Sequence, residues 1–104
     1  MTLEFIYYIT NKISMTQFEK AVAAARSGEL QTPRVFEGDK EYDYFGFQLK
    51  THIFQMKIMA KGMLFNGITA KQIKDYYGLT AKRNKDALAQ LEKIKEKYKA
   101  ERGF

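Results

Sequence analysis

The sequence predicts an α+β fold: a mostly helical single domain with an N-terminal strand, one β-hairpin, a central apolar helix and a C-terminal helical hairpin. A chain of 104 residues is too short for two domains with independent cores. Its hydrophobic spacing changes from period two to helical spacing about halfway along the chain. Capping residues and glycines recur where one segment gives way to the next. We therefore treat residues 1–104 as one domain.

A strand and a short helix are expected first. Residues 3–9 form an alternating run of aromatic and aliphatic side chains with apolar groups on both faces. Such a strand is expected inside the fold or paired with another chain. Thr16 and Glu19 have the spacing of a capping box, which predicts a helix over residues 15–27 that stops at Gly28.

A β-hairpin is predicted next. Residues 34–37 and 40–48 flank Gly38-Asp39, and glycine at the first central position permits the positive φ of a two-residue turn. This register places Glu37 opposite Lys40 and Arg34 opposite Asp43. Opposite charges across a strand pair stabilise a hairpin.

The central segment, residues 49–65, is predicted to be one helix that stops at Asn66-Gly67. It is apolar on nearly every side, so several neighbours must cover it. Two interpretations stay open, because the helix is either the centre of the core or presents one face to a partner.

The C-terminal third reads as a helical hairpin. Thr69 and Gln72 repeat the capping-box spacing and predict a short helix that ends at Gly78. Thr80 is expected to cap a last helix that runs to about residue 100. Ala87, Leu91, Ile94 and Tyr98 form a seam of about two heptads, which suits packing on the domain or self-association.

The composition excludes several classes of function. The chain has no cysteine and one histidine, which excludes a disulfide framework, thiol chemistry and cysteine zinc sites. His52 is interpreted as a hydrogen-bonded structural residue. No paired carboxylates, nucleophile beside a base or phosphate loop is found. We therefore predict a non-enzyme with no catalytic residue, metal or cofactor. No apolar run is long enough to cross a membrane and no secretory signal is seen, so a cytoplasmic protein is expected.

Aromatic and methionine side chains are the first candidate binding residues. Adjacent aromatics cannot all face one core, and methionines suit surfaces that accept varied apolar partners. The alternative is that they complete the core. The nine candidates are Phe45, Phe47, Phe54, Met56, Met59, Met63, Phe65, Tyr76 and Tyr77.

Basic residues give a second candidate site. The formal net charge is +6, and residues 67–104 carry ten basic against five acidic side chains. This excess indicates either a nucleic-acid partner or a solvated surface. The helical hairpin has the outline of a helix-turn-helix, although Asn84 stands where that motif usually has an apolar residue. The candidate nucleic-acid residues are Lys71, Lys74, Lys82, Arg83 and Lys85.

The run KGMLFNGITAKQIKDYYGLTAKRNKDALAQLEKIKEKY, together with the small size and the high content of Lys, Tyr and Phe, resembles small proteins of siphophages of Gram-positive bacteria. Among these, the chain is most similar to the tail-assembly chaperones, and the similarity covers the whole chain in composition without fixing single residues. The resemblance implies a non-virion protein of the host cytoplasm that keeps the hydrophobic tape-measure protein soluble. Self-association of several copies is expected to extend its binding surface.

Overall fold

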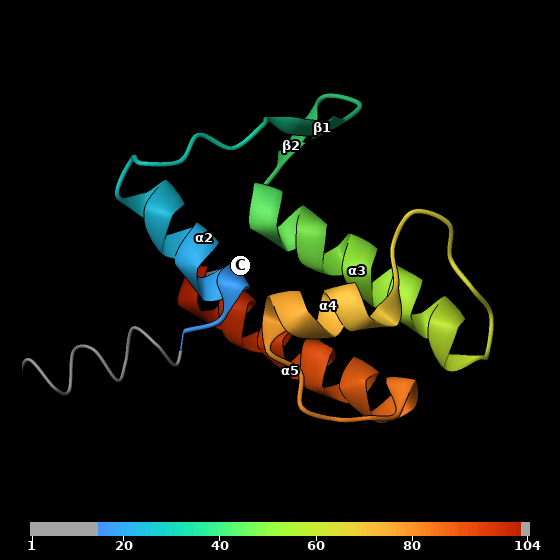
Figure 1. The fold of residues 1–104 in the computed structure, drawn as a ribbon. Helices are drawn as coiled ribbons and strands as arrows, with labels where there is room; N and C mark the ends of the chain where they lie inside the picture. The colour runs from blue at the N-terminus through green and yellow to red at the C-terminus, as the bar shows by residue number, and fades with distance from the viewer. Residues whose placement is uncertain (1–14, 103–104) are drawn as a thin grey trace, which may run out of the picture.

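The computed structural model describes residues 15–102, and it is mostly helical with one antiparallel hairpin (Figure 1). This confirms the predicted α+β fold class. The strand predicted over residues 3–9 lies outside the described residues. The elements are α2 (Gln17–Arg26), β1 (Val35–Glu37), β2 (Lys40–Tyr42), α3 (Tyr44–Ala60), α4 (Ala70–Tyr77) and α5 (Asn84–Arg102).

Both predicted capping boxes form, although α2 begins at Gln17 rather than at residue 15. The Thr16 hydroxyl accepts from the Glu19 N–H at 3.1 Å, and the Glu19 carboxylate accepts from the Thr16 N–H at 3.0 Å. Thr69 and Gln72 form the same reciprocal pair at the start of α4. Each pair satisfies two backbone donors that the helix leaves free. The ends also agree with prediction: α2 stops one residue early and α4 is closed by Gly78, which has φ +67°.

The hairpin has the predicted turn and register, but its second strand is shorter than predicted. Glu37 pairs with Lys40, as expected, and the ladder ends at Tyr42. The predicted pairing of Arg34 with Asp43 is wrong. The Arg34 guanidinium instead forms two hydrogen bonds with Glu41, at 2.9 and 3.1 Å, because Asp43 has already left the strand to cap α3.

The central helix begins and ends five residues earlier than predicted, since it spans Tyr44–Ala60 rather than residues 49–65. The Asp43 carboxylate accepts from the Gly46 N–H at 3.0 Å and so fixes the start. At the other end Gly62, with φ +87°, turns the chain out of the helix. Asn66-Gly67 therefore lies in the loop that follows, and Phe45 and Phe47 lie on a helix rather than on a strand.

The last helix does not begin at Thr80, so that predicted cap is wrong. It begins at Asn84, and the Ala87 N–H donates to the Arg83 carbonyl at 2.9 Å. The Thr80 hydroxyl instead accepts from the Gln90 amide at 2.9 Å, and the Gln90 carbonyl accepts from two loop N–H groups. Gln90, six residues after the start of α5, thus holds the loop that a cap residue was expected to organise.

Helices α3 and α5 run in opposite directions and form the largest interface between elements (Figure 1). The Asn84 amide donates to the Met59 carbonyl at one end, and the Tyr98 hydroxyl donates to the Asp43 carboxylate at the other. Helices α2 and α4 pack together beside this pair. The buried core residues of the described chain are Phe18, Val22, Phe45, Leu49, Ile53, Met56, Met59, Ile73, Tyr77, Ala87, Leu91 and Tyr98.

Four rings form an aromatic core where the elements meet, and Phe18 is at its centre. Its ring centroid lies 5.8 Å from that of Phe45, 5.0 Å from that of Tyr77 and 5.8 Å from that of Tyr98. These rings belong to four helices, and most of them meet at steep angles, the arrangement that aromatic quadrupoles favour. The aromatic core therefore joins the four described helices.

Candidate functional site

Four of the nine predicted binding residues lie in the core. Phe45, Met56, Met59 and Tyr77 are buried and pack against other core residues. The first three face inward because α3 turns the side that carries them toward α5 and α4. Tyr77 is the last residue of α4 and points into the same core. The surface of the described fold therefore does not include them.

Other predicted residues are exposed along α3 and the loop that follows it. Phe47 is 41% exposed, Phe54 is 60% exposed and Met63 is 55% exposed. The half-buried Phe65 packs edge-on against Phe54, with ring centroids 6.5 Å apart. Sequence reasoning missed Leu64, which is 96% exposed, because the helix was predicted to continue through it. We call the set Phe47, Phe54, Met63, Leu64 and Phe65 the α3 surface.

Tyr76, the ninth predicted residue, does not belong to the α3 surface. It is half-buried, and its hydroxyl donates to the Gln48 side-chain carbonyl at 3.1 Å. The Tyr76 ring lies 4.8 Å from the Tyr77 ring. Tyr76 therefore closes the edge of the core with its hydroxyl bonded inside the fold.

His52 and Tyr77 form a polar contact at the edge of the core. The His52 Nδ1 atom lies 2.6 Å from the Tyr77 hydroxyl oxygen, and the two groups are hydrogen-bonded. Burial lowers the pKa of His52 below its ordinary value and raises the pKa of Tyr77, because a low-dielectric setting disfavours the charged form of each. The predicted hydrogen bond of His52 is therefore confirmed.

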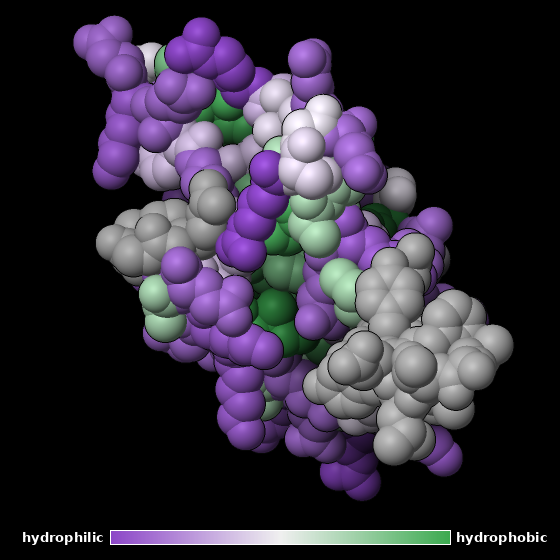
Figure 2. Space-filling model, turned by 90° about the vertical axis from the view of Figure 1, so that its left-hand side faces the viewer, coloured by the Kyte–Doolittle hydropathy of each residue, from purple (hydrophilic) through white to green (hydrophobic). Residues whose placement is uncertain are grey.

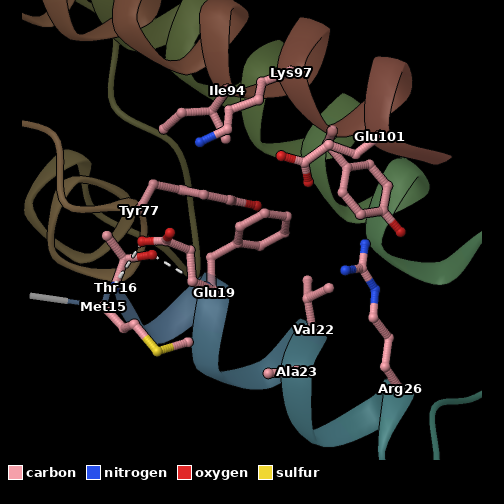
Figure 3. A pocket seen from close by; sticks show the side chains of 12 residues that line it. Met15, Thr16, Glu19, Val22, Ala23, Arg26, Tyr77, Ile94, Lys97 and Glu101 are labelled. Carbon is pink, nitrogen blue, oxygen red and sulfur yellow. Dashed lines mark hydrogen bonds between the residues drawn. The ribbon is translucent and has the colours of Figure 1, made fainter. Parts of the chain in front are cut away.

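A groove that the sequence did not reveal lies between α2 and α5 (Figure 3). Its volume is about 360 Å³, and Phe18, Val22 and Ile94 are among the apolar side chains that line it. Ile94, Lys97 and Glu101 project from α5 toward α2 in this view. Figure 2 views the left-hand side of Figure 1 and shows hydrophobic atoms in hollows between hydrophilic side chains. Such a volume is at the lower end of the range of small-molecule sites.

The groove has a mixed rim. Two carboxylates, Glu19 and Glu101, and two cations, Arg26 and Lys97, line it, and the Glu19 carboxylate is already engaged in capping α2. Its rim therefore has no charge preference of its own. Sequence patterns could not reveal the groove, because it depends on how α2 and α5 pack.

The five predicted nucleic-acid residues fall into two groups. Lys71 forms an ion pair with Asp75 at 2.9 Å, and the Lys74 ammonium donates to the Lys82 carbonyl at 2.6 Å. Lys82, Arg83 and Lys85 are exposed around the start of α5. These last three are available to a partner, whereas the first two are engaged on or beside α4.

The helical hairpin differs from a helix-turn-helix in two respects. Six residues, 78–83, connect α4 and α5, whereas the motif uses a turn of three or four. The half-buried Asn84 donates to the Met59 carbonyl at 3.4 Å, so the start of α5 packs on the end of α3. The polar residue at this position is therefore explained by a contact with α3.

Within residues 15–102, no group of three or more His, Asp or Glu side chains is arranged to hold a metal ion. No helix in the same part of the chain is long and apolar enough to span a membrane. Comparison of the chain with models of protein families, with curated proteins and with solved structures finds no match.

Proposed function

We propose that this protein is a non-catalytic binding protein whose α3 surface captures apolar helical segments of a client. The observation that carries the proposal is the exposure of Phe47 and Phe54 on α3 and of Met63 and Leu64 in the loop that follows it. Several large apolar side chains on one side of a small domain mark a site of interaction. The resemblance to tail-assembly chaperones supports the tape-measure protein as the client.

In the proposed mode of capture, a client helix packs along the exposed face of α3. A client helix places its apolar stripe on the Phe47 and Phe54 rings, and the Met63 thioether adapts to different side chains. Several weak sites on a long client gain from multivalency when copies of the chain associate. In this proposal the chaperone acts in the host cytoplasm, stays outside the virion and leaves when tube subunits compete for the same client surface.

The test is a solubility assay with an aromatic-containing fragment of a tape-measure protein. The wild-type chain is expected to hold the fragment in the supernatant after dilution from denaturant, whereas a triple F47S/F54S/L64S variant is expected to lose this activity. A matched control is the double L30S/F36S variant, because Leu30 and Phe36 are also large, apolar and exposed. Equal activity of wild type and the triple variant rejects the α3 surface as the binding site.

A second candidate function is nucleic-acid binding through the start of α5. The observation that favours it is the exposure of Lys82, Arg83 and Lys85, where they are free to contact phosphates. Affinity for random duplex or single-stranded DNA should then fall by orders of magnitude between about 50 and about 200 mM salt. It should also fall in a K82Q/R83Q/K85Q variant, and absence of binding at the lower salt concentration rejects this candidate.

A further inference from the structure

The exposed residues of α3 form a single regular stripe. They are Phe47, Lys50, Phe54 and Lys57, and Lys61 continues the line one residue beyond the end of the helix. The spacing is three, four, three and four residues, the spacing of side chains that line one face of a helix. From Phe47 to Lys61 the stripe is about 21 Å long at 1.5 Å per residue.

Aromatic and cationic side chains share this stripe, and α3 carries no acidic residue. Within the described residues, none of the three lysines forms an ion pair with a carboxylate. Lys50 lies over the Tyr42 ring at 5.9 Å, a contact with an uncharged group that does not neutralise the ammonium. The face that offers apolar rings to a partner therefore also offers a row of uncompensated positive charge.

We infer that the partner of the α3 surface is an amphipathic helix whose apolar stripe is bordered by carboxylates. This inference rests on the proposed function, and it adds the charge and the spacing of the bound segment. Apolar side chains of the partner pack on Phe47 and Phe54, while Asp or Glu three or four residues away pairs with Lys50, Lys57 and Lys61. Complementary charge gives register and selectivity to an apolar contact that by itself has little.

Two other occupants fit the stripe less well. A single-stranded nucleic acid would stack bases on the two rings, but Met63 and Leu64 extend the surface with aliphatic side chains, which suit a protein partner. A second copy of the chain would meet the stripe with its own α3 face. That contact would place a row of lysines against a row of lysines, and like charges disfavour it.

The test uses three peptides of about 18 residues, long enough to cover the stripe as a helix. They share one apolar stripe of Leu and Phe and differ only in the flanking positions, which are Glu, Gln or Lys. Fluorescence anisotropy measures the binding of each peptide to the full chain. The Glu peptide is expected to bind about tenfold more tightly than the Gln peptide, since three exposed ion pairs together have about that effect. The Lys peptide is expected to bind most weakly.

A K50Q/K57Q/K61Q variant should bind the Glu and Gln peptides equally. Its control is K82Q/K85Q/K93Q, which removes the same charge from exposed positions on and before α5 and should keep the preference for Glu. Circular dichroism verifies that both variants fold.

Each contrary outcome overturns the inference in its own way. Equal binding of the Glu and Gln peptides by the wild-type chain rejects the acidic partner and leaves the proposed function standing. Binding of none of the peptides rejects both. If a single-stranded oligonucleotide displaces the Glu peptide and binds only when the three lysines are present, the partner of the α3 surface is a nucleic acid and not an acidic helix. If the chain self-associates and the triple lysine variant does not, the partner is a second copy of the chain.

Discussion

The aromatic core and the α3 surface contain the same types of side chain in opposite surroundings. Phe18 contacts the rings of Phe45, Tyr76, Tyr77 and Tyr98 at centroid distances between 5.0 and 6.1 Å. Among the described rings, Phe54 contacts that of Phe65. More than half of the surface of Phe54 is exposed to water. The first phenylalanine holds four helices together, whereas the second is free to contact a partner. Stability and binding are therefore expected to respond to different phenylalanines.

The largest expected effect is on the core side of this comparison. Phe18→Ala removes the ring at the junction of four helices and is expected to lower the free energy of unfolding by about 3–5 kcal/mol. Phe54→Ala is expected to change it by no more than about 0.5 kcal/mol, because the ring is exposed. Urea denaturation of the two variants measures both values. A comparable loss of stability for both substitutions would contradict the assignment of Phe18 to the core and of Phe54 to a binding surface.

The next effect concerns the place where α4 meets the start of α2. Gly78 has φ +67°, and a Cβ atom there would lie 2.5 Å from the Thr16 methyl carbon. Gly78→Ala therefore combines a left-handed backbone with a steric clash and is expected to cost about 2 kcal/mol or more.

Two control variants separate the causes of that loss. Gly62 has φ +87°, and a Cβ atom there would meet open space, so Gly62→Ala measures the backbone cost alone, about 1 kcal/mol. Thr16→Ser keeps the capping hydroxyl but lacks the methyl group, so adding it to Gly78→Ala should recover part of the stability. If Gly78→Ala and Gly62→Ala lower the free energy of unfolding equally, the close approach of α4 to α2 does not contribute to the cost of the Gly78 substitution.

Asp43 gives a smaller effect at the boundary between the hairpin and the core. Its carboxylate caps α3 through the Gly46 N–H and also accepts from the Tyr98 hydroxyl. Asp43→Ala is expected to cost about 1–2 kcal/mol, the usual effect of losing a helix cap. Asp43→Asn keeps an acceptor oxygen and should cost less. Thermal or urea unfolding of these variants, together with Tyr98→Phe, would expose a shared contribution as non-additivity.

The smallest expected effect is a dependence of stability on pH through His52. Burial lowers the pKa of His52 in the folded state below the ordinary value of 6.5. The unfolded chain therefore binds a proton first as the pH falls, and stability should decrease from pH 6.5 down to the folded-state pKa and then level off. Urea midpoints at pH 7.5 and 5.5 measure this change. The chain has one histidine, so His52→Gln should remove the dependence in that window, and its persistence would assign it to another group.

The sequence was most informative where local contacts decide the structure. The capping boxes at Thr16 and Thr69 predicted the starts of α2 and α4, because each is a contact between residues three apart. The positive φ of Gly78 likewise marks the end of α4 with a local signal. These elements carry their own start and stop signals, so packing did not have to be known.

The sequence was least informative where tertiary contacts decide. Residues 44–48 alternate in a way that favours a strand, yet Asp43 caps a helix there and Tyr98, 55 residues away, contacts the same carboxylate. The candidate site depends on tertiary contacts in the same way, because the sequence of an apolar helix does not reveal which of its faces the other helices will cover. Phe54 and Met56 could not be separated into surface and core until α5 was placed on one side of α3.

The hairpin has a consequence for the dynamics of the molecule. Each strand has three residues, and only Val35 and Tyr42 of the six are even half-buried. An isolated hairpin of this size is marginally stable in water, whereas the helices are joined by the aromatic core. In native-state hydrogen exchange, the amides of β1 and β2 should therefore exchange through local opening while those facing the core in α3 and α5 stay protected until global unfolding. The described chain would then have two exchange classes, one for the hairpin and one for the core-facing amides of the helices on both sides of it.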